Sequence, residues 1–230
     1  MSYREYKGNL FDSQAQTLVN TVNCVGVMGK GVALEFRRRF PMMYESYQTV
    51  CRNRLLKPGQ ILPYRQSEPW VLNLAVKNDW KHPSRLEWVE SCLNKFQDHY
   101  EELNITSVAF PWIGAMNGGL PWEQVHALMR RYLQNLPNID IEVVEFDPSA
   151  SDPLYRELSK QLQIHSTKEL AEKAAITTRA AELIFKGSEH ATSLAMVCQA
   201  PGIGKTTVER LYAYLVRSGS GDKPLQGGLF

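Results

Sequence analysis

The chain has 230 residues, of which 43% are hydrophobic and 22% are charged, and this length predicts one domain of ordinary size plus a small second one. A formal net charge of +2 is too small for a dedicated duplex-binding protein, so any nucleic-acid contact should be local. No apolar run is long enough to cross a membrane, and the first ten residues lack a signal-peptide pattern. We therefore expect a soluble, cytoplasmic protein.

The four cysteines, Cys24, Cys51, Cys92 and Cys198, stand far apart in the sequence. They form no Cys-x-x-Cys pair and no cluster with histidine, which argues against both a zinc site and a disulfide framework. A reducing compartment suits such a chain. We expect neither a metal ion nor a cofactor.

Strand and helix patterns alternate through the first 147 residues. In chain order they predict a strand at 16–22, a helix at 31–40 ended by Pro41, a strand at 70–76, a helix at 84–103, a strand at 107–111, a helix at 121–133 and a strand at 139–146. Such alternation predicts a largely parallel sheet covered by helices on both faces, with ligands at the carboxyl ends of the strands.

The composition changes after Phe146. Residues 147–153 form a short polar linker with two prolines, and the rest of the chain has helical patterns. We predict helices at 167–186, 190–200 and 206–216 within a small all-α domain at 154–217. A flexible, glycine- and serine-bearing tail follows at 218–230.

Two glycine-bearing loops follow predicted strands, Gly26-Val-Met-Gly-Lys-Gly31 and Gly114-Ala-Met-Asn-Gly-Gly119. Each lies before a predicted helix, where backbone N–H groups and the helix dipole favour an anion. Either loop alone could be an ordinary turn, but two at one sheet edge suggest a diphosphate held from two sides. Asn20 and Asn23 precede the first loop and either orient ribose hydroxyls or cap a turn.

Three stretches of the sequence are similar to those of a known family. They are Val19-Asn-Thr-Val-Asn-Cys-Val-Gly-Val-Met-Gly-Lys-Gly-Val-Ala-Leu-Glu-Phe36 with Phe40-Pro41, Val71-Leu-Asn-Leu-Ala-Val-Lys77 with Trp80 and Ser84-Arg-Leu86, and Pro111-Trp-Ile-Gly-Ala-Met-Asn-Gly-Gly-Leu-Pro-Trp122. Over residues 3–147 the chain closely resembles the DarG-type macrodomains, antitoxins that remove ADP-ribose from DNA. The terminal ADP-ribose protein glycohydrolase is a wider relative with the same layout. The resemblance implies a three-layer α/β/α macrodomain with a mixed, largely parallel sheet at 1–147.

The resemblance also implies the site residues. The catalytic lysine of the family falls on Lys77, either as a nucleophile or as an acid–base and positioning group. ADP-ribose would be bound by Asn9, Leu10, Asn20, Asn23, Gly26, Val27, Met28, Gly29, Gly31, Val32, Ile113, Gly114, Ala115, Met116, Asn117, Gly118, Gly119 and Leu120.

Two positions depart from the pattern of relatives. The protein-directed glycohydrolase has an aspartate where this chain has Gly118, so this site should work without that carboxylate, as the DarG type does. Many macrodomains carry an early Gly-Asp pair whose acid contacts the adenine amino group, whereas this chain has Gly8-Asn9. The amide oxygen of Asn9 can still accept that hydrogen bond, without charge assistance.

Three functions therefore compete. The first is a glycohydrolase that removes ADP-ribose from a DNA base, as an antitoxin or repair factor, with a cognate ADP-ribosyltransferase toxin as a candidate partner. The others are a non-catalytic ADP-ribose-binding module and a glycohydrolase acting on modified protein. Lys77 favours an enzyme, because recognition alone needs no lysine beside the distal ribose. Gly118 makes the protein-directed activity a poorer match.

Two features lie beyond residue 147. Residues 194–215 resemble a helix-hairpin-helix with Pro201-Gly-Ile-Gly204 as the hairpin, in which Gly202, Gly204 and Lys205 would bind a DNA phosphate without reading bases. The alternative is a tight turn between packed helices. The last residues, Gln226-Gly-Gly-Leu-Phe230, resemble the short peptides that dock on a bacterial sliding clamp, and the alternative there is a frayed terminus.

Overall fold

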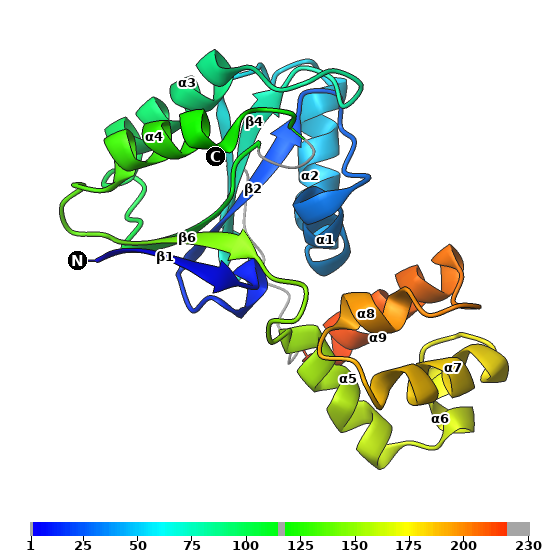
Figure 1. Ribbon diagram of the computed structural model, residues 1–230. Coiled ribbons are helices and arrows are strands. Elements are labelled where there is room, and N and C mark those ends of the chain that lie inside the picture. The colour runs from blue at the N-terminus through cyan, green and yellow to red at the C-terminus, as the bar shows by residue number, and fades with distance from the viewer. Residues whose placement is uncertain (1, 115–117, 220–230) are drawn as a thin grey trace. The chain divides into compact units, whose positions relative to one another are not determined.

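The computed structural model describes residues 2–114 and 118–219, and these fold into two compact units. The first unit comprises residues 2–6 and 13–146, apart from 115–117, and the second comprises residues 7–12 and 147–219. Figure 1 shows a sheet with helices in the first unit and helices alone after residue 147.

A six-stranded sheet is the framework of the first unit. Its strands are β1 Tyr3–Gly8, β2 Thr17–Asn23, β3 Ile61–Tyr64, β4 Trp70–Lys77, β5 Ser107–Pro111 and β6 Asp140–Phe146. They lie in the order β1-β6-β5-β2-β4-β3. β2 pairs in parallel with β4 and with β5, and β5 pairs in parallel with β6, whereas the edge strand β3 is antiparallel to β4. The predicted mixed, largely parallel sheet is confirmed.

Helices cover both faces of this sheet (Figure 1). They are α1 Gly31–Arg39, α2 Pro41–Arg52, α3 Leu86–His99 and α4 Trp122–Leu133. α1 and α2 lie on one face, and α3 and α4 lie together on the other. The expected three-layer α/β/α arrangement is therefore present.

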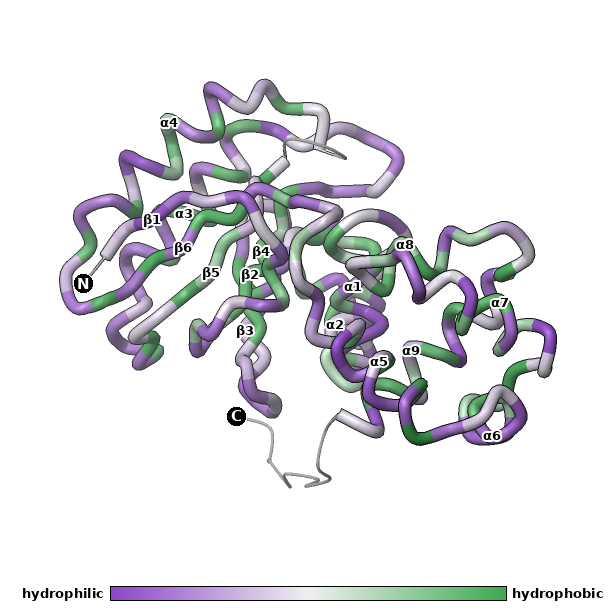
Figure 2. The backbone as a smooth tube through the Cα atoms, turned by 60° about the horizontal axis from the view of Figure 1, so that its bottom comes forward, coloured by the Kyte–Doolittle hydropathy of each residue, from purple (hydrophilic) through white to green (hydrophobic). Residues whose placement is uncertain are grey.

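Burial on both faces explains why the central strands are apolar along their whole length. In β4, Leu72, Leu74 and Val76 join the core that contains Val89 and Phe96 of α3. The alternate residues of β4 are also buried, on the face toward the other helices. Hydrophobic colouring follows β4 and β5 in Figure 2. The parallel strands are thus fixed in register, which fixes where their carboxyl ends meet.

Three elements of this unit are absent from the sequence predictions. Pro41 does end α1, but it is also the first residue of α2, where its missing N–H costs nothing. β1 lies at the sheet edge and carries three charged residues, Arg4, Glu5 and Lys7. β3 has four residues including Pro63, so neither strand gives a strong strand pattern. The helix predicted to start at Pro121 starts one residue later, at Trp122, and Pro121 is the N-cap of α4.

The second unit is helical. Its helices are η1 Leu10–Asp12, α5 Pro153–Ile164, α6 Thr167–Lys173, α7 Thr178–Ser188, α8 Leu194–Cys198 and α9 Lys205–Gly219. Its core includes Leu158, Leu170, Ile184, Leu194 and Leu211. No helix in the described parts of either unit is long and apolar enough to cross a membrane.

The prediction of one helix at 167–186 is wrong. The chain leaves the helix at Ala174, and Ala175 takes a left-handed conformation with φ 53°. Thr177 then caps α7 by accepting a hydrogen bond from the N–H of Ala180 at 3.1 Å. The high helix propensity of alanine concealed this break, because a threonine cap competes locally with helix continuation.

We predict that Asp152 stabilises the second unit by capping two helices. Its Oδ1 accepts from the N–H of Leu154 at the start of α5, 3.0 Å away, and its Oδ2 accepts from the N–H of Leu194 at the start of α8, 3.2 Å away. Asp152→Ala leaves buried donors unpaired and should lower the free energy of unfolding by roughly 1–3 kcal/mol. Urea unfolding followed by circular dichroism measures this. Asp152→Asn keeps a side-chain acceptor, so its free energy of unfolding should fall less than that of Asp152→Ala. Equal stability of the wild type and Asp152→Ala would refute the capping role.

Candidate functional site

The carboxyl ends of β2, β4 and β5 meet at one edge of the sheet. Asn23, the last residue of β2, is the register partner of Lys77, the last residue of β4. One residue on, the N–H of Cys24 donates to the carbonyl of Asn78 at 3.1 Å. The loop after β2 (residues 24–30, here the first loop) therefore begins directly beside Lys77.

Asn23 holds the first loop in shape. Its Oδ1 accepts from the N–H of Val25 at 3.0 Å and of Val27 at 3.3 Å, and its Nδ2 donates to the carbonyl of Val27. The hydroxyl of Tyr47 in α2 donates to the carbonyl of Asn23 at 2.7 Å and lies 3.1 Å from its Oδ1. Contact of Asn23 with ribose stays a prediction, and these bonds give the side chain a role in positioning the loop.

Asn20 lies beneath the same loop and is fully buried. Its Nδ2 donates to Oδ1 of Asn73 in β4 at 2.8 Å and lies 3.7 Å from the sulfur of the buried Met28. Asn73 in turn donates to the carbonyl of Leu62 in β3 at 3.3 Å. Among the described residues, Oδ1 of Asn20 has no partner. A buried amide pair thus ties the first loop to the sheet, and contact of Asn20 with a ligand stays a prediction.

The first loop leads into the N-terminus of α1, and the residues at this junction are exposed. Gly26 has φ 83°, and a Cβ there would lie 3.4 Å from the Cβ of Cys51, so a larger residue would be strained. Gly29 and Gly31 are exposed, Val27 is 37% exposed and Val32 is half-buried. Lys30 is the N-cap of α1 and makes no side-chain capping bond. The first N–H groups of α1 are thus available to an anion.

The second loop follows β5, from Trp112 to Pro121. Trp112 and Trp122 stack at its base with ring centroids 3.9 Å apart. Within it, Ile113 is buried, and the N–H of Leu120 donates to the carbonyl of Gly114 at 3.1 Å. Gly114 and Gly119 have φ of 68° and 72°, a region that favours glycine. The predicted residues Ala115, Met116 and Asn117 lie outside the described part of the chain.

Gly118 has no room for a side chain. A Cβ at this position would lie 2.3 Å from the carbonyl oxygen of Gly114 and 2.4 Å from its Cα. The carbonyl of Gly118 accepts a hydrogen bond from the N–H of Ser84 at 2.9 Å. The described backbone of this loop is therefore incompatible with a carboxylate at residue 118.

Two titratable groups, Lys77 at the end of β4 and Cys24 at the start of the first loop, lie close together here. The pKa of Lys77 is lowered from its ordinary value because the half-buried ammonium loses hydration. Burial raises the pKa of Cys24 to about 12, so this thiol is protonated at neutral pH and is a poor nucleophile. Of these two groups, only Lys77 is suited to chemistry here.

The remaining predicted residues lie in the second unit. Oδ1 of Asn9 accepts from the N–H of Phe11 at 3.0 Å, and Leu10 is buried. In the hairpin between α8 and α9, Gly202 has φ 90°, Gly204 has no atom within 4 Å of an added Cβ, and Lys205 begins α9. Gly202, Gly204 and Lys205 are exposed. The peptide at 226–230 lies outside the described residues.

Tyr47 and Asn73 are structural parts of the site that the sequence analysis missed. Tyr47 belongs to α2, whose buried residues Met43, Tyr47 and Cys51 recur every four positions. That spacing is the helical signal that could have revealed the helix and its inward-facing tyrosine. Asn73 is a polar residue within an apolar strand, which is a signal for a buried hydrogen bond.

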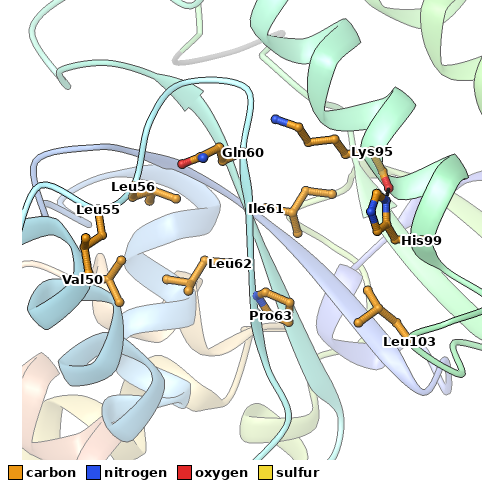
Figure 3. Close-up of a pocket in the computed structure, with 10 residues that line it drawn as sticks. All are labelled: Val50, Leu55, Leu56, Gln60, Ile61, Leu62, Pro63, Lys95, His99 and Leu103. Carbon is orange, nitrogen blue, oxygen red and sulfur yellow. Dashed lines mark hydrogen bonds between the residues drawn. The ribbon is translucent and has the colours of Figure 1, made fainter. Parts of the chain in front are cut away.

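A cavity of about 380 Å³ lies elsewhere, beside the edge strand β3 (Figure 3). Its lining is mostly apolar, and its polar members are Gln60, Lys95 and His99. Nζ of Lys95 donates to the carbonyl of Gly59 at 2.8 Å, so the cavity offers little to a diphosphate. No grouping of three or more potential metal-ligating side chains occurs at residues 2–114 or 118–219.

Known proteins share the arrangement of the first unit. The family model of the macro domain matches residues 19–129. A DNA ADP-ribosyl glycohydrolase of Thermus aquaticus is 41% identical over 146 residues, which cover 62% of this chain and 41% of that protein. This chain therefore spans about two fifths of the length of that curated relative.

Two solved structures are similar as well. The macrodomain of Thermus aquaticus DarG is 40% identical with a TM-score of 0.58, and the match covers 64% of this chain and 98% of that one. Thermosipho africanus DarTG in complex with ADP-ribose is 31% identical with a TM-score of 0.60, over 71% of this chain and 46% of that one. With its sheet order, its two glycine loops and this similarity, the chain belongs to the macrodomain family.

Proposed function

We propose that this protein hydrolyses the N-glycosidic bond between ADP-ribose and a DNA base, with Lys77 as the catalytic residue. The observation that carries the proposal is the place of Lys77: it ends β4, in register with Asn23, and its pKa is lowered by burial. A lysine with a lowered pKa at a ligand-binding edge is typical of a catalytic group. The similarity to proteins named DNA ADP-ribosyl glycohydrolase supports the choice of substrate.

The proposed site divides the work between two kinds of group. Exposed N–H groups at the first loop and the start of α1 bind the diphosphate together with the second loop, because both loops present glycine backbone. The amine of Lys77 acts at the anomeric carbon of the distal ribose, either by direct attack or by activating the attacking water. The bond from that carbon to the base nitrogen breaks, and the base nitrogen takes up the proton that the attacking amine or water loses. After direct attack, a water molecule then displaces the lysine from the same carbon and restores the free amine.

An antitoxin role extends this proposal. The Thermosipho protein named DNA ADP-ribosyl transferase-DNA ADP-ribosyl glycohydrolase fusion is 34% identical to this chain, and removal of a modification that a transferase adds is the reaction an antitoxin would perform. The candidate partner is therefore a cognate ADP-ribosyltransferase. Cys24, Cys51 and Cys92 are buried thiols, which suits the reducing cytoplasm. A role in DNA repair is the alternative within the same chemistry.

The hairpin between α8 and α9 is the proposed DNA-phosphate contact of the second unit. Ile203 packs against the helical core while Pro201, Gly202 and Gly204 are exposed. The backbone thus presents the N–H groups at the start of α9 beside the charge of Lys205, an arrangement that holds a phosphate without reading sequence. Binding through this unit would raise the local concentration of the modified strand. Docking of residues 226–230 on a sliding clamp remains a separate prediction.

Lys77→Ala should sharply reduce turnover but preserve ADP-ribose binding. Binding rests on the two loops, whereas Lys77 acts in the transition state, so the loss should fall on kcat by roughly 10²- to 10⁴-fold. The substrates are oligonucleotides modified on thymine or on guanine and a protein modified on glutamate, with calorimetry for ADP-ribose. The exposed Lys57→Ala is the matched control. Release only from the protein would favour the protein-directed activity, and tight ADP-ribose binding with no release would leave a recognition module.

The pH profile should identify the active form of Lys77. Its pKa in the folded protein lies below the ordinary 10.5, so the neutral amine accumulates as the pH rises through that lowered value. An amine that attacks or accepts a proton makes kcat rise over this window and then level off. The residual activity of Lys77→Ala should lack this rise. A kcat that falls over the same window would instead assign the charged ammonium as the active form.

The hairpin should contribute salt-dependent DNA affinity. Gly204→Glu places a carboxylate in open space at the start of α9, and Lys205→Glu reverses a charge there, so both should weaken binding and flatten its salt dependence. Fluorescence anisotropy with the full chain and a labelled oligonucleotide measures this. Lys168→Glu is the matched control, because Lys168 is also exposed in the first turn of a helix. Equal losses from Lys168→Glu and Lys205→Glu would contradict a site at the hairpin.

A further inference from the structure

The loop between β4 and α3, residues 78–85, joins the two glycine loops. At its start the carbonyl of Asn78 accepts from the N–H of Cys24, at the beginning of the first loop, at 3.1 Å. At its end the N–H of Ser84 donates to the carbonyl of Gly118, in the second loop, at 2.9 Å. This β4–α3 loop is therefore fixed along the edge where Lys77 lies.

A turn within the β4–α3 loop presents an indole to solvent. Oδ1 of Asp79 accepts from the N–H of Lys81 at 3.0 Å, and its carbonyl accepts from the N–H of His82 at 3.2 Å. Trp80, between them, is 54% exposed. The other four tryptophans are half-buried. Trp70, Trp112 and Trp122 pack against the core, and Arg85 lies over the ring of Trp88. A large aromatic surface held in water by a well-formed turn contributes little to the fold.

Two cationic side chains, Lys81 and Arg85, lie on the same loop as this indole. Nζ of Lys81 lies 5.5 Å from the centre of the Trp80 ring. His82 and Arg85 are exposed, and the guanidinium of Arg85 lies 5.0 Å from the centre of the Trp88 ring. The carboxylate of Asp79 is engaged by the turn itself. The attached first loop adds two exposed apolar side chains, Val25 and Val27, which are 48% and 37% exposed. The edge thus combines an aromatic face, cations and apolar side chains.

We infer that the β4–α3 loop holds a single DNA strand beside the modified base, with Trp80 stacked on a neighbouring base and Lys81 and Arg85 against phosphates. This inference rests on the proposed hydrolysis of ADP-ribosylated DNA. Aromatic side chains with interleaved cations are the general means of binding single strands, because every base has a stacking face. The loop provides this pairing within a few residues of Lys77. A duplex keeps its bases stacked on one another, so it would leave the indole without a partner.

The test measures binding of an unmodified oligonucleotide, so that it does not depend on hydrolysis. It uses the full chain carrying Lys205→Glu, which removes the proposed hairpin contact, and a labelled thymine-rich single strand. Trp80→Leu, which keeps apolar bulk but has no stacking face, should weaken binding by roughly tenfold or more. Trp80→Phe should retain most of the affinity. Lys81→Ala should reduce the slope of log affinity against log salt by about 0.7.

Arg65→Ala is the matched control, because Arg65 lies 4.8 Å over the ring of Trp70 at the opposite end of β4. This variant should bind the strand as the parent does. Equal binding by Trp80→Leu, Trp80→Phe and the parent would overturn the inference, as would binding of a duplex as tightly as the single strand. A comparable loss of ADP-ribose affinity in Trp80→Leu would also overturn it, since Trp80 would then belong to the ADP-ribose site. Failure of the proposed function alone would appear as strand binding through Trp80 without release of ADP-ribose.

Discussion

The hydrogen bonds of Asn23 are the constraint on which the site depends. The Asn23 side chain at the end of β2 binds the N–H groups of Val25 and Val27 and the carbonyl of Val27. The hydroxyl of Tyr47 in α2 also contacts Oδ1 of Asn23. These bonds fix a loop that the sheet alone would leave free, and they do so in register with Lys77. The other N–H groups of a loop held in this way need no rearrangement when an anion binds, which is how a backbone site gains affinity.

In the proposed function, the same edge combines binding and chemistry. Glycine backbone in both loops would offer donors to the diphosphate, and Gly118 has no space for a carboxylate. Lys77 ends β4 at this edge, and its pKa is lowered by burial. The β4–α3 loop, anchored to both glycine loops, places Trp80 and its cations where the rest of a nucleic-acid substrate would lie. In the proposed function, recognition of the two ends of the substrate therefore falls on different elements.

Much of the fold could be predicted from the sequence, because the central strands are apolar on both faces and the glycine loops follow them directly. β1 and β3 could not, since charged residues and Pro63 at sheet edges weaken the strand pattern. α2 was not predicted, because Pro41 was interpreted only as the end of the preceding helix. The break at Ala175 was hidden because its capping threonine lies within an alanine-rich run. The roles of Tyr47 and Asn73 depend on contacts between elements far apart in the chain, which spacing along a sequence does not reveal.

Amide chemical-shift mapping with ADP-ribose tests the central claim most directly, because it reports where the ligand binds without assuming any reaction. Titration of the full chain should perturb amides of the first loop, the start of α1, the second loop and the vicinity of Lys77. The amides around the cavity beside β3, lined by Gln60, Lys95 and His99, should stay unchanged. Perturbations centred on that cavity, or none at the two glycine loops at saturating ADP-ribose, would contradict the account.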